Sequence, residues 1–199
     1  KKIPQYKVLK KIADKKKLKL LTTYNQNSDL ELVSHQYDND QQILKVRLKN
    51  KKKIIKFKLN LIGKIQVKNI LMAMLAATRS GLNLASAAKL MIKIKPVEGR
   101  LEKIGKLKNN SKVILDYAHT PAALELALLN IREQFPNKKI SLVFGCGGER
   151  DFKKRPLMGK IAEKYSDRIY LTDDNPRNEN PSKIRKDIKV GIKKIKIKE

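Results

Sequence analysis

Residues 139–177 read "KISLVFGCGGERDFKKRPLMGKIAEKYSDRIYLTDDNPR", and this stretch decides the fold. The short apolar runs "KISLVFG" and "DRIYLT" are typical of buried strands, whereas "RPLMGKIAEKY" between them has the apolar spacing of a helix. A strand, a helix and a second strand in this order indicate a parallel pair with a right-handed crossover. The stretch therefore predicts an α/β sheet whose strands are followed by glycine-rich or polar loops.

The same alternation continues on both sides of this stretch. "KVILDY" predicts an earlier strand, and "PAALELALLNIREQF" predicts a helix with Thr120 as N-cap and Pro121 in its first turn. Downstream, "NPSKIRKDIKVGIKK" predicts another helix, with Asn180 as N-cap and Pro181 at its first position. Residues 99–199 are thus expected to form a Rossmann-like domain with a mostly parallel sheet.

The N-terminal half has a different pattern. "ILKVRLK" and "IIKFKLNL", joined by "NKKK", alternate apolar and polar residues and predict a β-hairpin with lysines on its solvent face. Residues 67–79 predict a helix that ends at Gly81, and "LASAAKLMIKI" predicts a second helix that stops at Pro96. Because the pattern changes after this proline, we expect two domains, residues 1–98 and residues 99–199.

The charge of the chain attracts anions but does not identify one. Its 47 Lys and Arg against 19 Asp and Glu give a formal charge of +28, which favours some anionic ligand or surface. However, 38 of these cations are Lys and only 9 are Arg, and they are scattered along the whole chain. Solvated surface lysines explain this as well as a basic binding face does. Aromatic residues are only 5% and Trp is absent, which disfavours base stacking.

The cysteine content and the hydropathy of the chain indicate its redox compartment and whether it crosses a membrane. Cys146 is the only cysteine, so no intrachain disulfide forms and a reducing compartment is the natural setting. The longest apolar stretch, "NILMAMLAA", is too short to span a bilayer, and no signal peptide is visible. The first residue is not Met, so we expect the chain to begin inside a longer protein.

Three polar clusters follow the three predicted strands, where ligands of such sheets bind. "DYAHTP" contains Asp116, either a turn former or an acceptor for a ribose, and His119, which would lie against a nucleotide. "GCGGERD" contains Arg150, either solvated and paired with a neighbouring acid or a clamp for a carboxylate. "GRLEKIGK" lacks the spacing of a phosphate-binding loop, so we do not assign one.

The third cluster, "DDNPR", indicates an amino-acid ligand. Asp173 and Asp174 could receive an ammonium group, Asn175 can donate and accept, Pro176 stiffens the loop, and Arg177 can fork onto a carboxylate. A nucleic-acid backbone would instead be repelled by the two acids. The cluster therefore favours an enzyme that handles a zwitterion.

These motifs, together with "LIGKIQVKNILMAMLAA" and "PVEGRLEKI", resemble the MurE ligases, which add diaminopimelate to UDP-N-acetylmuramoyl-L-alanyl-D-glutamate. The resemblance implies that residues 1–98 are the end of a central ATPase domain and that residues 99–199 are the C-terminal ligase domain, truncated at its end. One departure is Glu149, where the family usually has Asp. The resemblance also implies a Walker A loop, Mg²⁺ ligands and a carbamylated lysine upstream of this chain, and a closing segment downstream of it.

The resemblance further implies the site residues. Those expected to bind ATP are Asn69, Arg100, Asp116 and His119, and those expected to bind meso-diaminopimelate are Arg150, Asp174, Asn175, Pro176 and Arg177. No catalytic residue and no metal ligand is assigned within the chain.

The implied function is ATP-dependent amide formation through an acyl phosphate, in peptidoglycan precursor synthesis in the cytoplasm. Its cofactors would be ATP and Mg²⁺, and its partners the UDP-muramoyl dipeptide and meso-diaminopimelate. We expect a monomer with no specific nucleic acid and no membrane insertion, inactive on its own. Two alternatives stay open: a Mur-type ligase that adds lysine, which Arg177 would discriminate, and a basic nucleic-acid-binding module.

Overall fold

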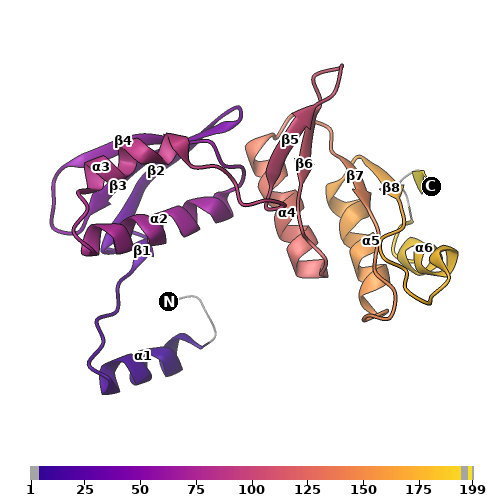
Figure 1. Ribbon diagram of the computed structural model, residues 1–199, viewed down its shortest axis with the longest axis horizontal. Coiled ribbons are helices and arrows are strands. Elements are labelled where there is room, and N and C mark those ends of the chain that lie inside the picture. The colour runs from indigo at the N-terminus through magenta and orange to yellow at the C-terminus, as the bar shows by residue number, and fades with distance from the viewer. Residues whose placement is uncertain (1–4, 194–196, 199) are drawn as a thin grey trace. The chain divides into compact units, whose positions relative to one another are not determined.

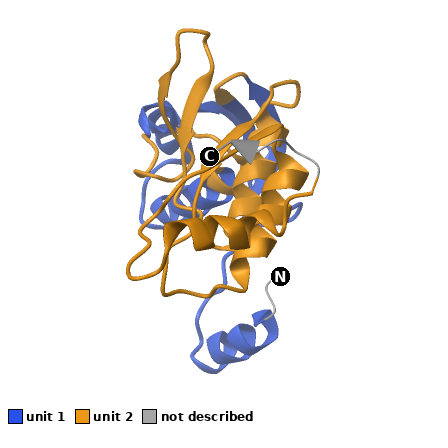
Figure 2. Ribbon diagram, turned by 90° about the vertical axis from the view of Figure 1, so that its right-hand side faces the viewer, with its two compact units in different colours: residues 1–38, 42–59, 67–94 blue, residues 39–41, 60–66, 95–199 orange. Residues whose placement is uncertain are grey.

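A computed structural model describes residues 5–193 and 197–198 of the chain. The chain forms two compact units (Figure 2). Residues 1–38, 42–59 and 67–94 make the first unit, and residues 39–41, 60–66 and 95–199 make the second. Each unit has its own helices and strands.

The first unit is built on a four-stranded sheet in the order β1-β2-β3-β4 (Figure 1). Strands β1 and β2 are parallel, and β3 and β4 are antiparallel. The helices of this unit follow from apolar residues at helical spacing, and α3 and the short helix η1 contact β4. The elements are α1 (Tyr6–Lys15), β1 (Thr23–Tyr24), β2 (Leu30–Asp38), β3 (Gln41–Leu48), β4 (Ile54–Leu59), α2 (Lys64–Arg79), α3 (Leu84–Leu90) and η1 (Met91–Lys93).

The predicted hairpin is confirmed as β3 and β4. Leu44 pairs with Phe57 across the two strands, and both side chains are buried. Two residues along β3, Val46 is buried as well, while Lys45 between them is exposed. The alternation seen in the sequence therefore puts the apolar face of the hairpin into the core and its lysines into solvent.

The end of α2 is also as predicted. Gly81 adopts φ +99°, a left-handed conformation that glycine enters without a Cβ penalty. Beyond it, the N–H of Leu82 donates to the carbonyl of Ala77 at 3.0 Å, which closes the helix in a Schellman motif. Helix α1 was not predicted. Its apolar residues Val8 and Ile12 recur at helical spacing, but lysines interrupt the run in the sequence.

The second unit contains the parallel sheet β7-β8-β9, which has the strand–helix–strand connection predicted from residues 139–177 (Figure 1). Its core gathers Leu128, Met158, Ala162, Ile169 and Ile188. Helix α5 contacts both α4 and α6. The elements are β5 (Glu102–Lys106), β6 (Lys112–Leu115), α4 (Pro121–Gln134), β7 (Ser141–Phe144), α5 (Lys154–Tyr165), β8 (Arg168–Leu171), α6 (Pro181–Lys189) and β9 (Ile197–Lys198).

Strand β6 differs from the expectation. It pairs antiparallel with β5 in a separate two-stranded sheet, with a register shift between Lys103 and Gly105. In the described part of the chain, β6 is therefore not a member of the parallel sheet. The rejected phosphate-loop motif "GRLEKIGK" is part of this hairpin, because β5 begins at Glu102. Two of the three polar clusters, not three, follow adjacent parallel strands.

The helix caps of the second unit are confirmed. Thr120 accepts a hydrogen bond from the N–H of Ala123, with Pro121 opening α4. Asn180 accepts one from the N–H of Ser182, with Pro181 opening α6. Helix α6 is shorter than predicted, since it ends at Lys189 rather than running on through the glycine that follows.

Two buried polar side chains of α4 hold residues 60–66. Asn130 accepts a hydrogen bond from the N–H of Ile65 at 3.1 Å, and Gln134 accepts one from the N–H of Gly63 at 2.9 Å. The amide of Gln134 also donates to the carbonyl of Asn39 at 3.1 Å. These contacts tie residues 60–66 and Asn39 to α4, and the hydrogen bond to the N–H of Gly63 lies in the buried part of this unit.

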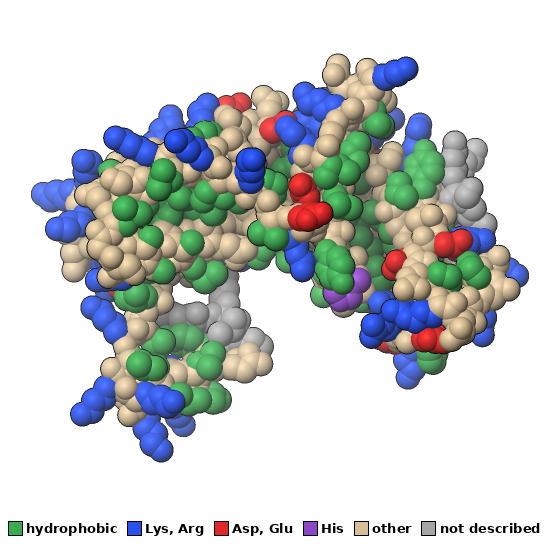
Figure 3. Space-filling model, viewed as in Figure 1, with side chains coloured by type: hydrophobic (Ala, Val, Ile, Leu, Met, Phe, Trp, Pro, Cys, Tyr) green, Lys and Arg blue, Asp and Glu red, His purple; other side chains and the backbone are tan. Residues whose placement is uncertain are grey.

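The basic side chains on the surface are dispersed, as their scatter along the sequence predicts. Lys and Arg side chains are spread over much of the face seen in Figure 3. Within the described residues, none of the helices is both long and apolar enough to cross a membrane.

Candidate functional site

Two loops meet where β7 and β8 end, because these strands are parallel neighbours in register from Ser141 to Phe144. The N–H of Gly148 donates to the carbonyl of Asn175 at 2.9 Å. A Cβ at Gly148 would lie 1.9 Å from the carbonyl oxygen of Pro176. We call residues 145–151 the glycine loop and residues 172–180 the DNPR loop. Only glycine at position 148 allows the two loops to approach this closely.

Arg177 lies across this junction. Its backbone is left-handed, with φ +51°, and its N–H donates to the Oδ1 of Asn175 at 3.3 Å. Its guanidinium donates through Nη1 to the carbonyl of Gly148 at 2.6 Å. One N–H of the Arg177 guanidinium is thus bound to the glycine loop, and the other N–H groups of this exposed side chain can bind a carboxylate.

The two adjacent acids of the DNPR loop differ in their partners. Asp173 forms an ion pair with Arg185 of α6, so its carboxylate already has a partner within the protein. Asp174 accepts a hydrogen bond from the N–H of Asn175 at 2.8 Å and pairs with no cation among the described residues. Of the pair, Asp174 is the carboxylate that can receive an ammonium group near Arg177.

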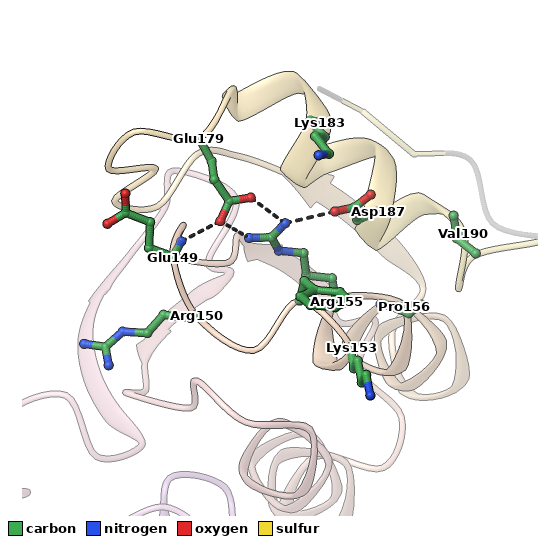
Figure 4. A pocket seen from close by; sticks show the side chains of 10 residues that line it. Glu149, Arg150, Lys153, Arg155, Pro156, Glu179, Lys183, Asp187 and Val190 are labelled. Carbon is green, nitrogen blue, oxygen red and sulfur yellow. Dashed lines mark hydrogen bonds and ion pairs between the residues drawn. The ribbon is translucent and has the colours of Figure 1, made fainter.

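Arg150 is exposed, and its side chain points away from those of Glu149 and Glu179 (Figure 4). Two acids, Glu149 and Asp151, flank it in the sequence. Neither acid pairs with it in the described part of the chain: Glu149 accepts from Asn178 at 2.7 Å, and Asp151 accepts from the N–H of Lys153 at 3.0 Å. Arg150 lines a pocket of about 850 Å³, which the DNPR loop residues 174–177 do not line. Its guanidinium is available for an anion.

Arg155, at the start of α5, is a residue that the sequence analysis missed. It is 1% exposed and donates to Glu179 and Asp187 (Figure 4). The signal that could have found it is its type, since arginine is rare beside lysine in this chain, and a planar fork suits buried carboxylates. Its hydrogen bonds lower the pKa of Glu179 to about 2.

Two of the four expected nucleotide-binding residues, Arg100 and His119, contact the ring of Tyr117 in the second unit, and a third, Asp116, directly precedes it in the chain. The guanidinium of Arg100 lies 5.0 Å from the centre of the Tyr117 ring, and the ring of His119 packs edge-on at 5.1 Å. Asp116 accepts from the N–H of Leu101 through Oδ2 at 2.9 Å. Tyr117 is 64% exposed, and it is an aromatic surface beside Arg100 and His119 that sequence reasoning did not single out.

The fourth of these residues, Asn69, is exposed on α2 of the first unit. The described residues contain no group of three or more His, Cys, Asp or Glu able to hold a metal ion. Cys146 in the glycine loop is buried, and burial raises the pKa of its thiol, which keeps it neutral. Its sulfur lies 3.7 Å from that of Met158, as expected for a packing role.

Comparison with known proteins gives one family and consistent relatives. The model of the family "Mur ligase, glutamate ligase domain" matches residues 99–199. A "UDP-N-acetylmuramoyl-L-alanyl-D-glutamate--2,6-diaminopimelate ligase" of Rickettsia montanensis is 36% identical over 192 residues, which cover 92% of this chain and 39% of that protein. A protein of the same name from Buchnera aphidicola subsp. Schizaphis graminum is 47% identical over 138 residues, 69% of this chain and 27% of that protein. The chain thus spans at most about two fifths of the length of these relatives.

Solved structures agree. The structure of a "UDP-N-acetylmuramoyl-L-alanyl-D-glutamate--2,6-diaminopimelate ligase" aligns over 98% of this chain and 40% of its own, with a TM-score of 0.68 and 28% identity. Folylpolyglutamate synthase of Mycobacterium tuberculosis, complexed with ADP, aligns over 99% of this chain and 43% of its own, with a TM-score of 0.74. At 17% identity, the second match shows the fold alone.

Proposed function

The chain belongs to the Mur ligase family, and on that premise we propose that it serves the ATP-dependent addition of meso-diaminopimelate to UDP-N-acetylmuramoyl-L-alanyl-D-glutamate. The observation that carries the choice of amino acid is Arg177. Its fork is anchored on the carbonyl of Gly148, beside the carboxylate of Asp174, which pairs with no cation in the described residues. This arrangement suits a ligand with an ammonium group and a carboxylate.

The proposed division of labour follows the family. Residues 1–98 supply the C-terminal part of the central ATPase domain, and residues 99–199 supply the ligase domain. Asn69, Arg100, Asp116 and His119 are proposed to bind ATP. For Arg100 and His119, the support is their contact with the exposed ring of Tyr117, to which a nucleobase could stack, and Asp116 directly precedes Tyr117 in the chain.

The proposed amino-acid site consists of Arg150, Asp174, Asn175, Pro176 and Arg177. Asp174 would hold an ammonium group, and Arg177 would hold the distal carboxylate through its free donors. Asn175 positions Arg177 by accepting its N–H. Arg150, with no partner among the described residues, would take a second carboxylate of the same ligand.

In the proposed reaction, ATP transfers its γ-phosphoryl group to the γ-carboxylate of D-glutamate, which gives ADP and an acyl phosphate. The amine of diaminopimelate then attacks the acyl carbon, and phosphate leaves as the amide forms. The chain's own residues would bind and orient the amine for this attack, an effect that can supply several kcal/mol of the barrier reduction. Mg²⁺ bound with ATP would stabilise the phosphoryl charge, and no residue of this chain is assigned to it. We further propose a monomer in the cytoplasm.

The test is a comparison of ligands on the 199-residue chain by isothermal titration calorimetry. We expect meso-diaminopimelate to bind more tightly than L-lysine, because only the former has the distal carboxylate. Arg177→Ala should reduce the ratio of the two dissociation constants by about tenfold or more. The reason is that charge-assisted hydrogen bonds from the guanidinium contribute on the order of 1.5–3 kcal/mol. Arg168→Ala, an exposed arginine at the start of β8, is the matched control and should change neither affinity.

Two outcomes would contradict the proposal. Equal affinity of the unsubstituted chain for both amino acids would favour a lysine-adding ligase of the same family. Unchanged selectivity in Arg177→Ala would remove Arg177 from the site.

A further inference from the structure

Arg155 is the largest fully buried side chain among the described residues, with 1% exposure. Burying a guanidinium is costly, and even a well-paired buried ion pair often contributes no more stability than apolar side chains of similar volume would. Its presence beneath the candidate site therefore calls for a role other than stabilising the fold.

The contacts of Arg155 join three separate segments (Figure 4). Nη1 and Nη2 donate to the two carboxylate oxygens of Glu179 at 2.9 and 2.8 Å, and Nη1 also donates to Asp187 of α6 at 2.9 Å. Nη2 reaches the carbonyl of Gly147 at 3.4 Å. One side chain thus holds the glycine loop, the DNPR loop and α6 together.

Glu179 also contacts the backbone next to each of the two proposed ligand-binding arginines, Arg150 and Arg177. Its Oε1 also accepts a hydrogen bond from the N–H of Glu149. The backbone of Glu149 is left-handed, with φ +52°, and the next residue is Arg150. The N–H of Glu179 donates to the carbonyl of Pro176 at 3.0 Å, which closes a tight turn around Arg177. The backbone before Arg150 is therefore held by the carboxylate of Glu179, and the turn around Arg177 is closed by its backbone N–H, so both contacts depend on where this one residue lies.

We propose that Arg155 is a positioning residue for the amino-acid site: through Glu179 it sets the directions of Arg150 and Arg177, and so the selectivity for a ligand with a second carboxylate. This inference rests on the proposed function. Arg155 reaches the ligand only through these partners, since its own guanidinium is buried. The low pKa of Glu179, about 2, keeps this carboxylate charged at neutral pH.

The decisive variant is Arg155→Lys in the 199-residue chain. Lysine keeps the charge, but its compact ammonium cannot hold Glu179, Asp187 and Gly147 together. Arg132→Lys is the matched control, because Arg132 also contacts a carboxylate and two carbonyls, those of Asp167, Lys138 and Tyr165, and none of them belongs to either loop. Both variants should lower the thermal midpoint.

The readout is the ratio of the dissociation constants for L-lysine and meso-diaminopimelate, measured by calorimetry. We expect Arg155→Lys to reduce this ratio by about tenfold, which corresponds to ~1.4 kcal/mol, whereas Arg132→Lys leaves it unchanged. A residue that only stabilised the fold would lower the thermal midpoint without changing this ratio.

Glu179→Gln decides the matter if Arg155→Lys does not fold. Glu179 is 28% exposed, and glutamine has its shape but lacks the charge and the second acceptor. It should reduce the same ratio. If the unsubstituted chain is selective and every folded variant stays equally selective, the inference about Arg155 is wrong while the proposed function stands. If the unsubstituted chain does not bind meso-diaminopimelate, the proposed function fails and the inference fails with it.

Discussion

Gly148→Ala should separate the two loops that form the candidate site. A methyl group there would lie 1.9 Å from the carbonyl oxygen and 2.6 Å from the carbonyl carbon of Pro176. Both are backbone atoms, so no side-chain rotation relieves the clash. The hydrogen bond from the N–H of Gly148 to Asn175 would be stretched or lost as the loops move apart.

The expected cost follows from these two effects. Overpacking contributes about 1–3 kcal/mol and the lost hydrogen bond about 1 kcal/mol, which together give roughly 2–4 kcal/mol. For a unit of this size, each kcal/mol lowers the thermal midpoint by about 4 °C. Affinity for meso-diaminopimelate should fall as well, because Arg177 is anchored on the carbonyl of this same glycine.

The assay is urea unfolding followed by circular dichroism, with Gly105→Ala as the matched control. A Cβ at Gly105 would meet nothing within 4 Å, and its φ is not positive, so this change should stay within about 0.5 kcal/mol. Equal stability of the two variants would refute the close approach of the loops.

Two further predictions concern the frame of the second unit. Gln134→Ala should lower the free energy of unfolding by about 1–3 kcal/mol, because it removes the hydrogen bonds of Gln134 to the buried N–H of Gly63 and to the carbonyl of Asn39. In the same urea assay, Glu133→Ala, which removes only an exposed ion pair with Lys64, should cost less than about 1 kcal/mol, and a similar loss in both variants would contradict the argument. The pKa of Asp167 is held below its usual value, first by the N–H of Ile140 and then by Arg132. The stability from Asp167 is therefore present above the pKa of the unfolded chain and is lost as pH falls below about 4, so Asp167→Asn should flatten this acid loss, and an unchanged pH profile would count against it.

The sequence predicted the elements whose signals are local. Thr120 and Asn180 cap their helices as expected, because a polar side chain before a proline and an apolar run has few other uses. Gly81 likewise ends α2. The pairing of β6 was not predictable in this way, since strand partners are chosen by contacts distant in sequence.

The candidate site was predictable only in part. The DNPR loop was recognised from residue types, and the structure brings it against the glycine loop. Its acids could not be told apart from sequence, because the ion pair of Asp173 with Arg185 depends on where α6 lies. Arg155 was missed because its burial depends on the packing of three segments, and no local pattern records that.

The most direct test of the account is a crystal structure of the chain with meso-diaminopimelate. One carboxylate of the ligand should lie within hydrogen-bond distance of the free donors of Arg177, with an ammonium group at Asp174 and the second carboxylate at Arg150. A ligand bound only against Lys153 and Lys183, in the pocket that Arg150 also lines, with Arg177 uninvolved, would contradict the proposed site.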